Sequence, residues 1–291
     1  MTPKPFEKIN FGIGATQELS LRVSVATLVR VLFAHPKDGD LILALERKAA
    51  LLQAESGRTV EVKAQPFGGA IRIHDLRMLR DLIGDFHFDS EEAHFERDFR
   101  IFIRPSSWET VQQFCLDHLT NANDPVLETD PSRELAEEFA AALKISLKPD
   151  QYMCKPMGAA VEDNPARTQN IDTRGCLTVR VYRIFEARIL DSSLSHAMLS
   201  NSENHSNQKL REFALEDARK GGKGRANAIL TLPMERLRET YLAMSPEARN
   251  APILFRTNRL DETVAAVLEG VTVPKYRDNY ENAARGGSEV I

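Results

Sequence analysis

The chain has 291 residues, of which 42% are hydrophobic, so it is long and apolar enough to bury a core. Its 38 basic and 42 acidic residues give a formal net charge of −4, which predicts no general attraction to nucleic acid or to an anionic membrane surface. No apolar run approaches the roughly 20 residues of a membrane-spanning helix, and the first residues lack the apolar core of a secretion signal. We therefore expect a soluble, cytoplasmic protein.

The first half of the chain carries β patterns. Residues 1–20 are expected to form a polar lead-in. Residues 21–34 and 41–48 are rich in valine and leucine, and the Pro-Asp-Gly-containing stretch 35–40 between them is typical of a turn, so together they predict a hairpin. Residues 59–64 alternate polar and apolar side chains, which predicts a half-exposed strand.

A glycine pair, Gly68 and Gly69, follows that strand and permits close backbone approaches that a side chain would block. The segment 76–129 then reads as a separate unit. It begins with a helix at 76–83, continues with a strand near 97–104, and ends with a helix capped by Ser106 or Ser107.

The second half of the chain starts with a helix over 131–143, for which Asp130 is the expected N-cap and Pro131 the first helical residue. The remaining elements are predicted as a turn-rich segment at 149–175, a strand at 177–190, a polar loop at 200–208, a helix at 208–220, a strand followed by a helix across 226–242, a helix at 258–271, and a polar tail after 275.

The helix at 131–143 concentrates acidic residues on one flank. Glu134, Glu137 and Glu138 fall within an arc of about 100°, next to the apolar side that contains Leu135 and Phe139. Carboxylate oxygens are the ligands that hard divalent cations such as Mg²⁺ prefer, and a bound cation would remove the repulsion between them. The alternative reading is an ordinary solvated acidic face.

Within that helix the stretch RELAEE (133–138) resembles the REUXEE core of the Nudix box, GX5EX7REUXEEXGU, where U is aliphatic. The glycine pair in QPFGGAIR (65–72) resembles the turn that opens the box, and the strands before and after it resemble the family's elements in order. The similarity covers most of residues 21–270. It implies an α/β fold, a Nudix-type α/β/α sandwich with a mixed sheet, spanning 21–275 between a lead-in at 1–20 and a polar tail at 276–291.

The box departs from the family pattern in three places. Asp75 stands where its first glutamate is expected, Ala140 replaces its late glycine, and 57 residues (76–132) separate Asp75 from Arg133 where the pattern has seven. This implies an inserted small α/β subdomain at 76–129. Part of the insertion, residues 98–115, is similar to a Nudix-like subgroup associated with bacterial antiviral nucleotide-signalling operons.

The resemblance also implies site residues. Glu134, Glu137 and Glu138 match the glutamates that bind Mg²⁺ or Mn²⁺, Arg133 matches the arginine that orients one of them, and Gly68 would offer a backbone carbonyl to the metal. The implied reaction is a metal-dependent attack of water on a phosphoanhydride in a nucleoside diphosphate linked to another moiety, as in a Nudix-type pyrophosphohydrolase.

Residues assigned to the substrate are Gly69, Arg72, Lys223 and Arg225. The last two lie in the basic run 220–225, which is either a phosphate clamp or a connector. The family often takes a general base from a later loop, and the candidates are Glu203, Glu212 and Glu216.

Other features have more than one reading. The acidic run 87–94 contains two histidines but no known metal-ligand spacing, and the phenylalanines of the 76–129 segment are either local core or surfaces on which a base stacks. The cysteines, which are odd in number and lack metal-ligand spacing, are expected to be buried free thiols; they are Cys115, Cys154 and Cys176.

Two functions outside catalysis remain open. One is a non-catalytic Nudix-fold module that senses or binds a nucleotide, and the other is a scaffold that uses the insertion to hold a partner. The expected partner is a nucleotide-type small molecule, and homodimers are common in the family.

Overall fold

The computed structural model describes residues 20–54, 57–121, 123–168, 173 and 175–234. Within these ranges the chain is a mixed α/β protein with eight strands in one sheet and six α-helices. Contacts divide it into two compact units. The first comprises Met1–Val25, Ala70–Glu128 and Val161–Val181, and the second comprises Ala26–Gly69, Thr129–Ala160 and Tyr182–Ile291. Strands β1, β6 and β7 contribute residues to both units.

The predicted hairpin is confirmed. Strand β1 (Leu21–Ala34) pairs antiparallel with β2 (Leu41–Ala54), and the turn between them closes where the His35 backbone N–H donates to the Asp40 carbonyl at 2.7 Å. Strand β2 runs six residues past the predicted end at position 48, because it continues to pair with β3 (Gly57–Gln65).

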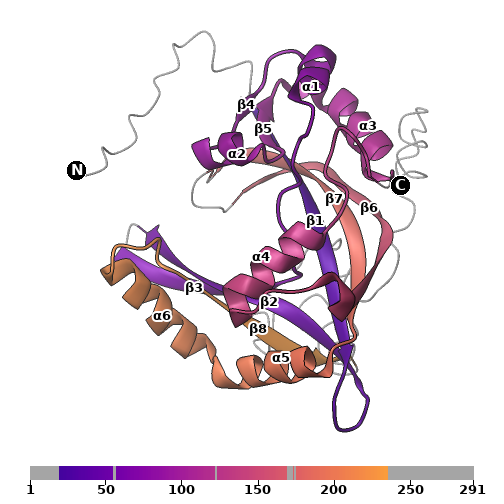
Figure 1. Ribbon diagram of the computed structural model, residues 1–291. Helices are drawn as coiled ribbons and strands as arrows, with labels where there is room; N and C mark the ends of the chain where they lie inside the picture. Colours follow the sequence, from indigo (N-terminus) through magenta and orange to yellow (C-terminus); the bar gives the residue numbers. More distant parts are fainter. Residues whose placement is uncertain (1–19, 55–56, 122, 169–172, 174, 235–291) are drawn as a thin grey trace, which may run out of the picture. The chain divides into compact units, whose positions relative to one another are not determined.

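Strand β2 organises the second unit. One of its edges pairs antiparallel with β8 (Arg225–Pro233) over residues 42–50, and its other edge pairs first with β1 and then with β3. Helices α4 (Ser132–Leu143), α5 (Ser192–Asn204) and α6 (Asn207–Arg219) all contact β8 (Figure 1).

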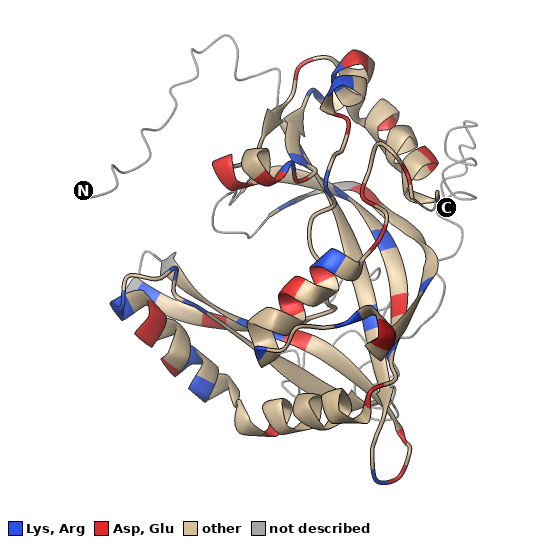
Figure 2. Cartoon of the chain, in the orientation of Figure 1, with Lys and Arg blue, Asp and Glu red and all other residues tan. Residues whose placement is uncertain are grey.

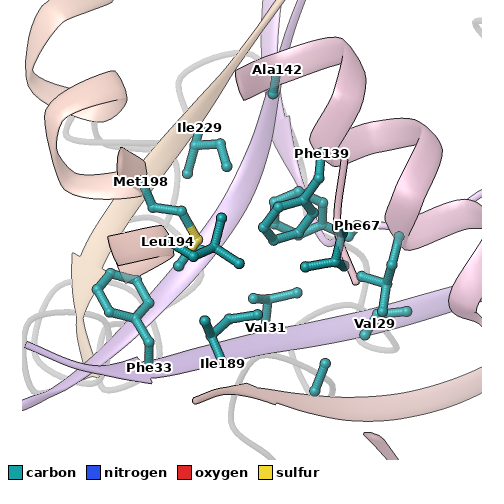
Figure 3. Close-up of a cluster of buried hydrophobic side chains, with 14 of the residues drawn as sticks. Val29, Val31, Phe33, Phe67, Phe139, Ala142, Ile189, Leu194, Met198 and Ile229 are labelled. Carbon is teal, nitrogen blue, oxygen red and sulfur yellow. The ribbon is translucent and has the colours of Figure 1, made fainter. Parts of the chain in front are cut away.

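One apolar cluster holds these elements together (Figure 3). Helix α4 contributes Leu135 and Phe139, and the Phe139 ring stacks on Phe67 with 5.1 Å between ring centroids. Helix α5 contributes Leu194 and Met198. The apolar side predicted for the acidic helix is therefore confirmed, and it fixes which flank of α4 faces the sheet.

The first unit combines two short strands with three helices: β4 (His87–Phe88), β5 (Arg100–Ile103), α1 (Leu76–Ile83), α2 (Glu91–Glu96) and α3 (Trp108–Leu119). Strand β5 pairs antiparallel with the first residues of β1 and with β4. Asp75 caps α1, since its carboxylate accepts hydrogen bonds from the backbone N–H groups of Arg77 and Met78. The segment 76–129, which the Nudix resemblance implies is an insertion, falls within this unit except for its last residue.

One predicted helix start is wrong by one residue. Helix α4 begins at Ser132 with Pro131 as its N-cap, although the Asp130 carboxylate does accept from the Ser132 backbone N–H at 2.7 Å. Helix α3 begins at Trp108 with Ser107 at its N-cap, as predicted, but the Ser107 side chain accepts no capping hydrogen bond, and a 3₁₀ turn at Pro105–Ser107 leads directly into the helix.

Two predicted irregular segments are regular. Most of the turn-rich stretch 149–175 is strand β6 (Tyr152–Arg167), which follows a 3₁₀ turn at Pro149–Gln151 and pairs with β7 (Leu177–Ile189). Of the polar stretch 200–208, only His205 and Ser206 are a connection; the rest is the end of α5 and the start of α6. Its Asn201 side chain donates to the Ala142 carbonyl and accepts from the Ile229 backbone N–H, so a polar residue there serves packing.

Several predictions fall outside the described residues: the lead-in to residue 19, the helix after Pro233, the helix at 258–271 and the tail. Within the described ranges, no helix combines the length and apolar character needed to span a bilayer.

Candidate functional site

The glycine turn lies directly against the acidic helix. A Cβ added at Gly69 would lie 1.9 Å from the Glu134 Oε2 atom, so only a glycine leaves room for this carboxylate. Gly68 has φ +142°, and a Cβ there would lie 1.9 Å from the Thr27 carbonyl oxygen. The turn is held to β1 by hydrogen bonds from Thr27 N–H to the Gly69 carbonyl and from Val29 N–H to the Phe67 carbonyl. Two segments 65 residues apart in sequence therefore meet at this point.

Arg133 neutralises two of the three predicted glutamates. Its guanidinium lies 2.6 Å from Glu134 Oε1 and 3.2 Å from Glu137 Oε1. Glu134 is buried against the glycine turn, whereas the Glu137 side chain is 55% exposed one helical turn further along. Figure 2 shows acidic and basic positions side by side along α4. The sequence predicted an exposed patch of carboxylates on α4. Glu134 is instead buried, because this part of the acidic flank of α4 faces the Gly69 backbone.

The third glutamate belongs to a different ion-pair group. Glu138 Oε1 is 2.9 Å from Lys48 Nζ, and the same Lys48 Nζ is 2.9 Å from Glu46 Oε2. Glu46 is completely buried and accepts further hydrogen bonds from Gln65 Nε2 at 3.2 Å and Asn227 Nδ2 at 3.1 Å. One lysine thus bridges a strand carboxyl and a helix carboxyl.

The sheet register explains why these side chains meet. Glu46 and Lys48 are two residues apart on β2, so they point to the same face. In the antiparallel pairing Gln65 lies opposite Glu46, and Asn227 lies opposite Lys48. Cross-strand neighbours are close enough for hydrogen bonding, so three strands supply the polar groups that surround the buried carboxyl.

The ionisation of this group follows from burial. Burial raises the pKa of Glu46 well above its ordinary value, and the neighbouring Glu138 carboxyl raises it further, while Lys48 opposes both. Burial by itself lowers the pKa of Lys48, but the attraction of Glu46 and of Glu138 outweighs it, so this pKa is raised.

The residues assigned to the substrate are not all brought together. Gly69 lies at the glycine turn, but Arg72 belongs to the first unit and pairs with Glu96. Lys223 lies in the turn between α6 and β8, and Arg225 is the first residue of β8, opposite Ala50. The basic run is therefore the connector between a helix and a strand, and its use as a phosphate clamp stays a prediction.

The candidate general bases lie on α5 and α6. Glu212 accepts a hydrogen bond from Gln208, and Glu216 forms an ion pair with Lys220 at 2.6 Å, both along the same helix. Glu203 is an exposed residue in the last turn of α5. None of the three lies at the glycine turn or the lysine bridge among the contacts of the described residues.

The other sequence features fall mostly in the first unit. Phe99 and Phe114 pack edge to face and Phe86 packs on Phe88; Phe86, Phe99 and Phe114 are core, Phe88 is half-buried, and Phe95 is exposed. The cysteines in the described ranges are free thiols, but the expectation that all three are buried holds only for Cys115, whose pKa is raised by burial. Cys154 is exposed and Cys176 is half-buried.

Sequence reasoning missed the polar group on the sheet. Glu46, Lys48, Gln65 and Asn227 are separated by up to 181 positions, and only the register brings them together. A signal was present in the stretch ALERKAA, where three consecutive charged residues interrupt an apolar strand and two of them, Glu46 and Lys48, have the spacing that places them on one face. Charged residues are buried only when paired, so this pattern predicts partners for them elsewhere in the chain.

Within the described residues, no group of three or more His, Cys, Asp or Glu side chains is arranged so that it could hold a metal ion. The chain matches no protein-family model, no curated protein and no solved structure.

Proposed function

We propose that this chain hydrolyses a phosphoanhydride in a nucleoside diphosphate linked to another moiety, with Mg²⁺ or Mn²⁺ as cofactor. The observation that carries the proposal is the packing of the RELAEE helix against the glycine turn, with the Glu134 carboxylate in the space that a side chain at position 69 would fill. Burying a carboxylate beside a backbone bend costs free energy, and an acidic helix can be stable without it.

The residues of α4 and of the glycine turn have the donor chemistry of the cofactor, although the described residues do not arrange them as a group that holds a metal ion. Glu134, Glu137 and Glu138 offer carboxylate oxygens, and the turn offers the Gly68 backbone carbonyl, which is the ligand type that Mg²⁺ and Mn²⁺ take. Their charges are balanced by Arg133 and Lys48 in the structure, so a divalent ion competes with these two basic side chains. When bound, the ion supplies charge neutralisation of the diphosphate and activation of a water molecule.

The chain's own residues have separable tasks. Arg133 holds Glu134 in one orientation, and its second contact with Glu137 keeps that carboxylate over the same turn of helix. The absence of a side chain at Gly69 makes room for the Glu134 carboxylate beside the backbone of the turn. Lys48 provides a positive charge that suits a phosphate oxygen, since its side chain is 35% exposed.

The test is a turnover assay. The protein is incubated with a panel of nucleoside diphosphate derivatives and dinucleotides, with Mg²⁺ or Mn²⁺ and with neither. We expect metal-dependent products that are lost in Glu137→Gln and Glu138→Gln and retained in Glu91→Gln, a matched change at an exposed position of α2 in the other unit. Turnover that survives in both α4 variants, or no turnover of any compound, would refute the proposal.

A second candidate function is a nucleotide-binding module that does not turn its ligand over. The specific observation in its favour is that Arg133 and Lys48 already neutralise the α4 carboxylates without a metal. In the same panel this function predicts saturable nucleotide binding, measured by calorimetry, without products. If the chain neither binds nor hydrolyses any compound of the panel, the scaffold hypothesis remains.

A further inference from the structure

Strand β7 carries a buried arginine without an ionic partner. Arg183 is only 8% exposed, and among the described residues no carboxylate lies within ion-pair distance of its guanidinium. Its Nη1 atom donates to the Gly158 carbonyl at 3.5 Å, which is the long limit of such contacts. The guanidinium also lies over the Phe185 ring, 5.2 Å from the centroid, but a ring offers no oxygen lone pair to the N–H groups. A positive charge is therefore buried with little to compensate it.

The unused donors of Arg183 form one edge of its guanidinium. Nε is buried without a hydrogen-bond partner, and no described residue accepts a hydrogen bond from Nη2. Nε and Nη2 together are an edge with which an arginine holds a carboxylate or phosphate group. Arg22, in the other unit, uses this same edge, since its Nε and Nη2 atoms donate to Asp89 at 2.9 and 2.6 Å. Arg183 presents the edge without the carboxylate.

A second buried arginine of the same unit shows what a structural role looks like. Arg47 also has no carboxylate partner among the described residues, and its Nε likewise lacks an acceptor. Both of its Nη groups, however, donate to oxygen atoms, which belong to Ser202, His205, Asn207 and Ile229. Burial lowers the pKa of both guanidinium groups, which stay charged at neutral pH. The protein thus solvates Arg47 with four acceptors and Arg183 with one distant acceptor.

The strand pattern places Arg183 at the end of an apolar row. Arg183, Phe185, Ala187 and Ile189 alternate along β7 and therefore share one face of the sheet. The last three belong to the apolar cluster that also contains residues of α4, whereas Arg183 extends the row by one position beyond this cluster. Apolar surroundings strengthen the attraction between a guanidinium and an anion, because little water screens it.

We propose that Arg183 binds the phosphate or carboxylate group of a small molecule through its Nε and Nη2 donors. The ligand supplies the negative charge and the acceptor oxygens that the protein does not provide. The Gly158 carbonyl and the Phe185 ring hold the guanidinium in place, and its residual exposure shows that the residue is not sealed from solvent. This inference is independent of the proposed function, because it uses neither a metal nor the glutamates of α4.

The first test compares the Tm of wild type, Arg183→Met and Arg47→Met without any ligand. Methionine keeps an unbranched side chain and removes the charge. Loss of an uncompensated buried charge should raise the Tm of Arg183→Met by about 2 °C or more. Arg47→Met leaves four oxygen atoms without their donor and should lower the Tm instead. If Arg183→Met lowers the Tm as much as Arg47→Met does, the arginine is structural and the proposal is refuted.

The second test measures the rise in Tm on adding inorganic phosphate or acetate, against sodium chloride of equal ionic strength and with EDTA throughout. The rise should be at least about 2 °C larger in wild type than in Arg183→Met, and intermediate in Arg183→Lys, which keeps the charge but loses the edge of two donors. Arg188→Met, a matched change at an exposed arginine of the same strand, should respond as wild type does.

The two anions distinguish the possible ligands. A response to phosphate alone assigns the site to a phosphate group, and a response to acetate assigns it to a carboxylate. If each anion raises the Tm of wild type and Arg183→Met equally, the effect is that of a salt on any protein, and the proposal is refuted. Because EDTA removes metal ions, this failure would leave the proposed metal-dependent hydrolysis untouched.

Discussion

Replacing Gly69 with alanine tests whether the contact between the glycine turn and the acidic helix is built into the fold. The new Cβ would lie 1.9 Å from Oε2 and 2.5 Å from Cδ of Glu134, whereas ordinary contacts begin near 3.4 Å. The backbone at this position does not require a glycine, so the steric conflict with the carboxylate is the cause of any penalty.

The expected magnitude follows from what must move. Glu134 is buried and its carboxylate is 2.6 Å from the Arg133 guanidinium, so the side chain cannot turn into solvent without breaking a partly buried ion pair. Overpacking of a buried position costs about 1–3 kcal/mol. We expect Gly69→Ala to lower the free energy of unfolding of the full chain by that amount, measured by urea denaturation followed by circular dichroism.

A double-mutant cycle with Glu134→Ala isolates the cause, because the truncated side chain leaves space for the new methyl group. In that background Gly69→Ala should cost less than about 0.5 kcal/mol, which gives a coupling energy of about 1–3 kcal/mol between the two positions. If Gly69→Ala costs the same in both backgrounds, the glycine is required for some other reason. The reasoning that joins the turn to the helix would then fail.

Three further predictions concern the stability of the two units. Phe139→Ala should cost about 3–5 kcal/mol in urea denaturation because the ring is fully buried, whereas Phe95→Ala, at a position 86% exposed, should change stability by less than about 0.5 kcal/mol; similar costs would contradict the described core. Ser206→Ala removes the hydroxyl that accepts a hydrogen bond from the third residue of α6 and should cost about 0.5–2 kcal/mol, while Ser206→Asp, which restores an acceptor, should recover most of this loss. Burial alone raises the pKa of Asp124, but two backbone N–H groups and His118 outweigh it, so its folded-state pKa is lowered. The stability that the ionised Asp124 contributes is therefore present above its unfolded pKa of about 4 and is lost as the pH falls through the folded pKa. Asp124→Asn should be less stable than wild type at pH 7, and this difference should become smaller on acidification. A difference that is independent of pH would contradict this assignment.

Much of the local structure could be predicted from sequence alone. The β1–β2 hairpin follows from two apolar runs around a Pro-Asp-Gly turn, and the apolar side of α4 follows from the spacing of Leu135 and Phe139. The strands at 177–189 and 225–233 were also recovered within a residue or two. These elements are predictable because their patterns depend on residues that are close in sequence.

The secondary structure of elements with polar sequences could be assigned only from the tertiary structure. Strand β6 contains Pro156, Asn164 and Pro165, which locally favour turns, yet pairing with β7 makes it a strand. The last turns of α5 look like a loop in sequence, but Asn201 uses its polar side chain to join α4 and β8, which compensates for its low helix propensity.

The candidate site divides in the same way. The sequence by itself determined that three glutamates and Arg133 share one flank of a helix, because 3.6 residues per turn fix their relative directions. Only the tertiary structure decided that Glu134 is buried beside Gly69 and that Glu138 shares Lys48 with a buried carboxyl on β2. The physical reason is that sheet register and helix packing are set by the burial of the whole apolar core, so the neighbours of each charge depend on residues far away in the chain.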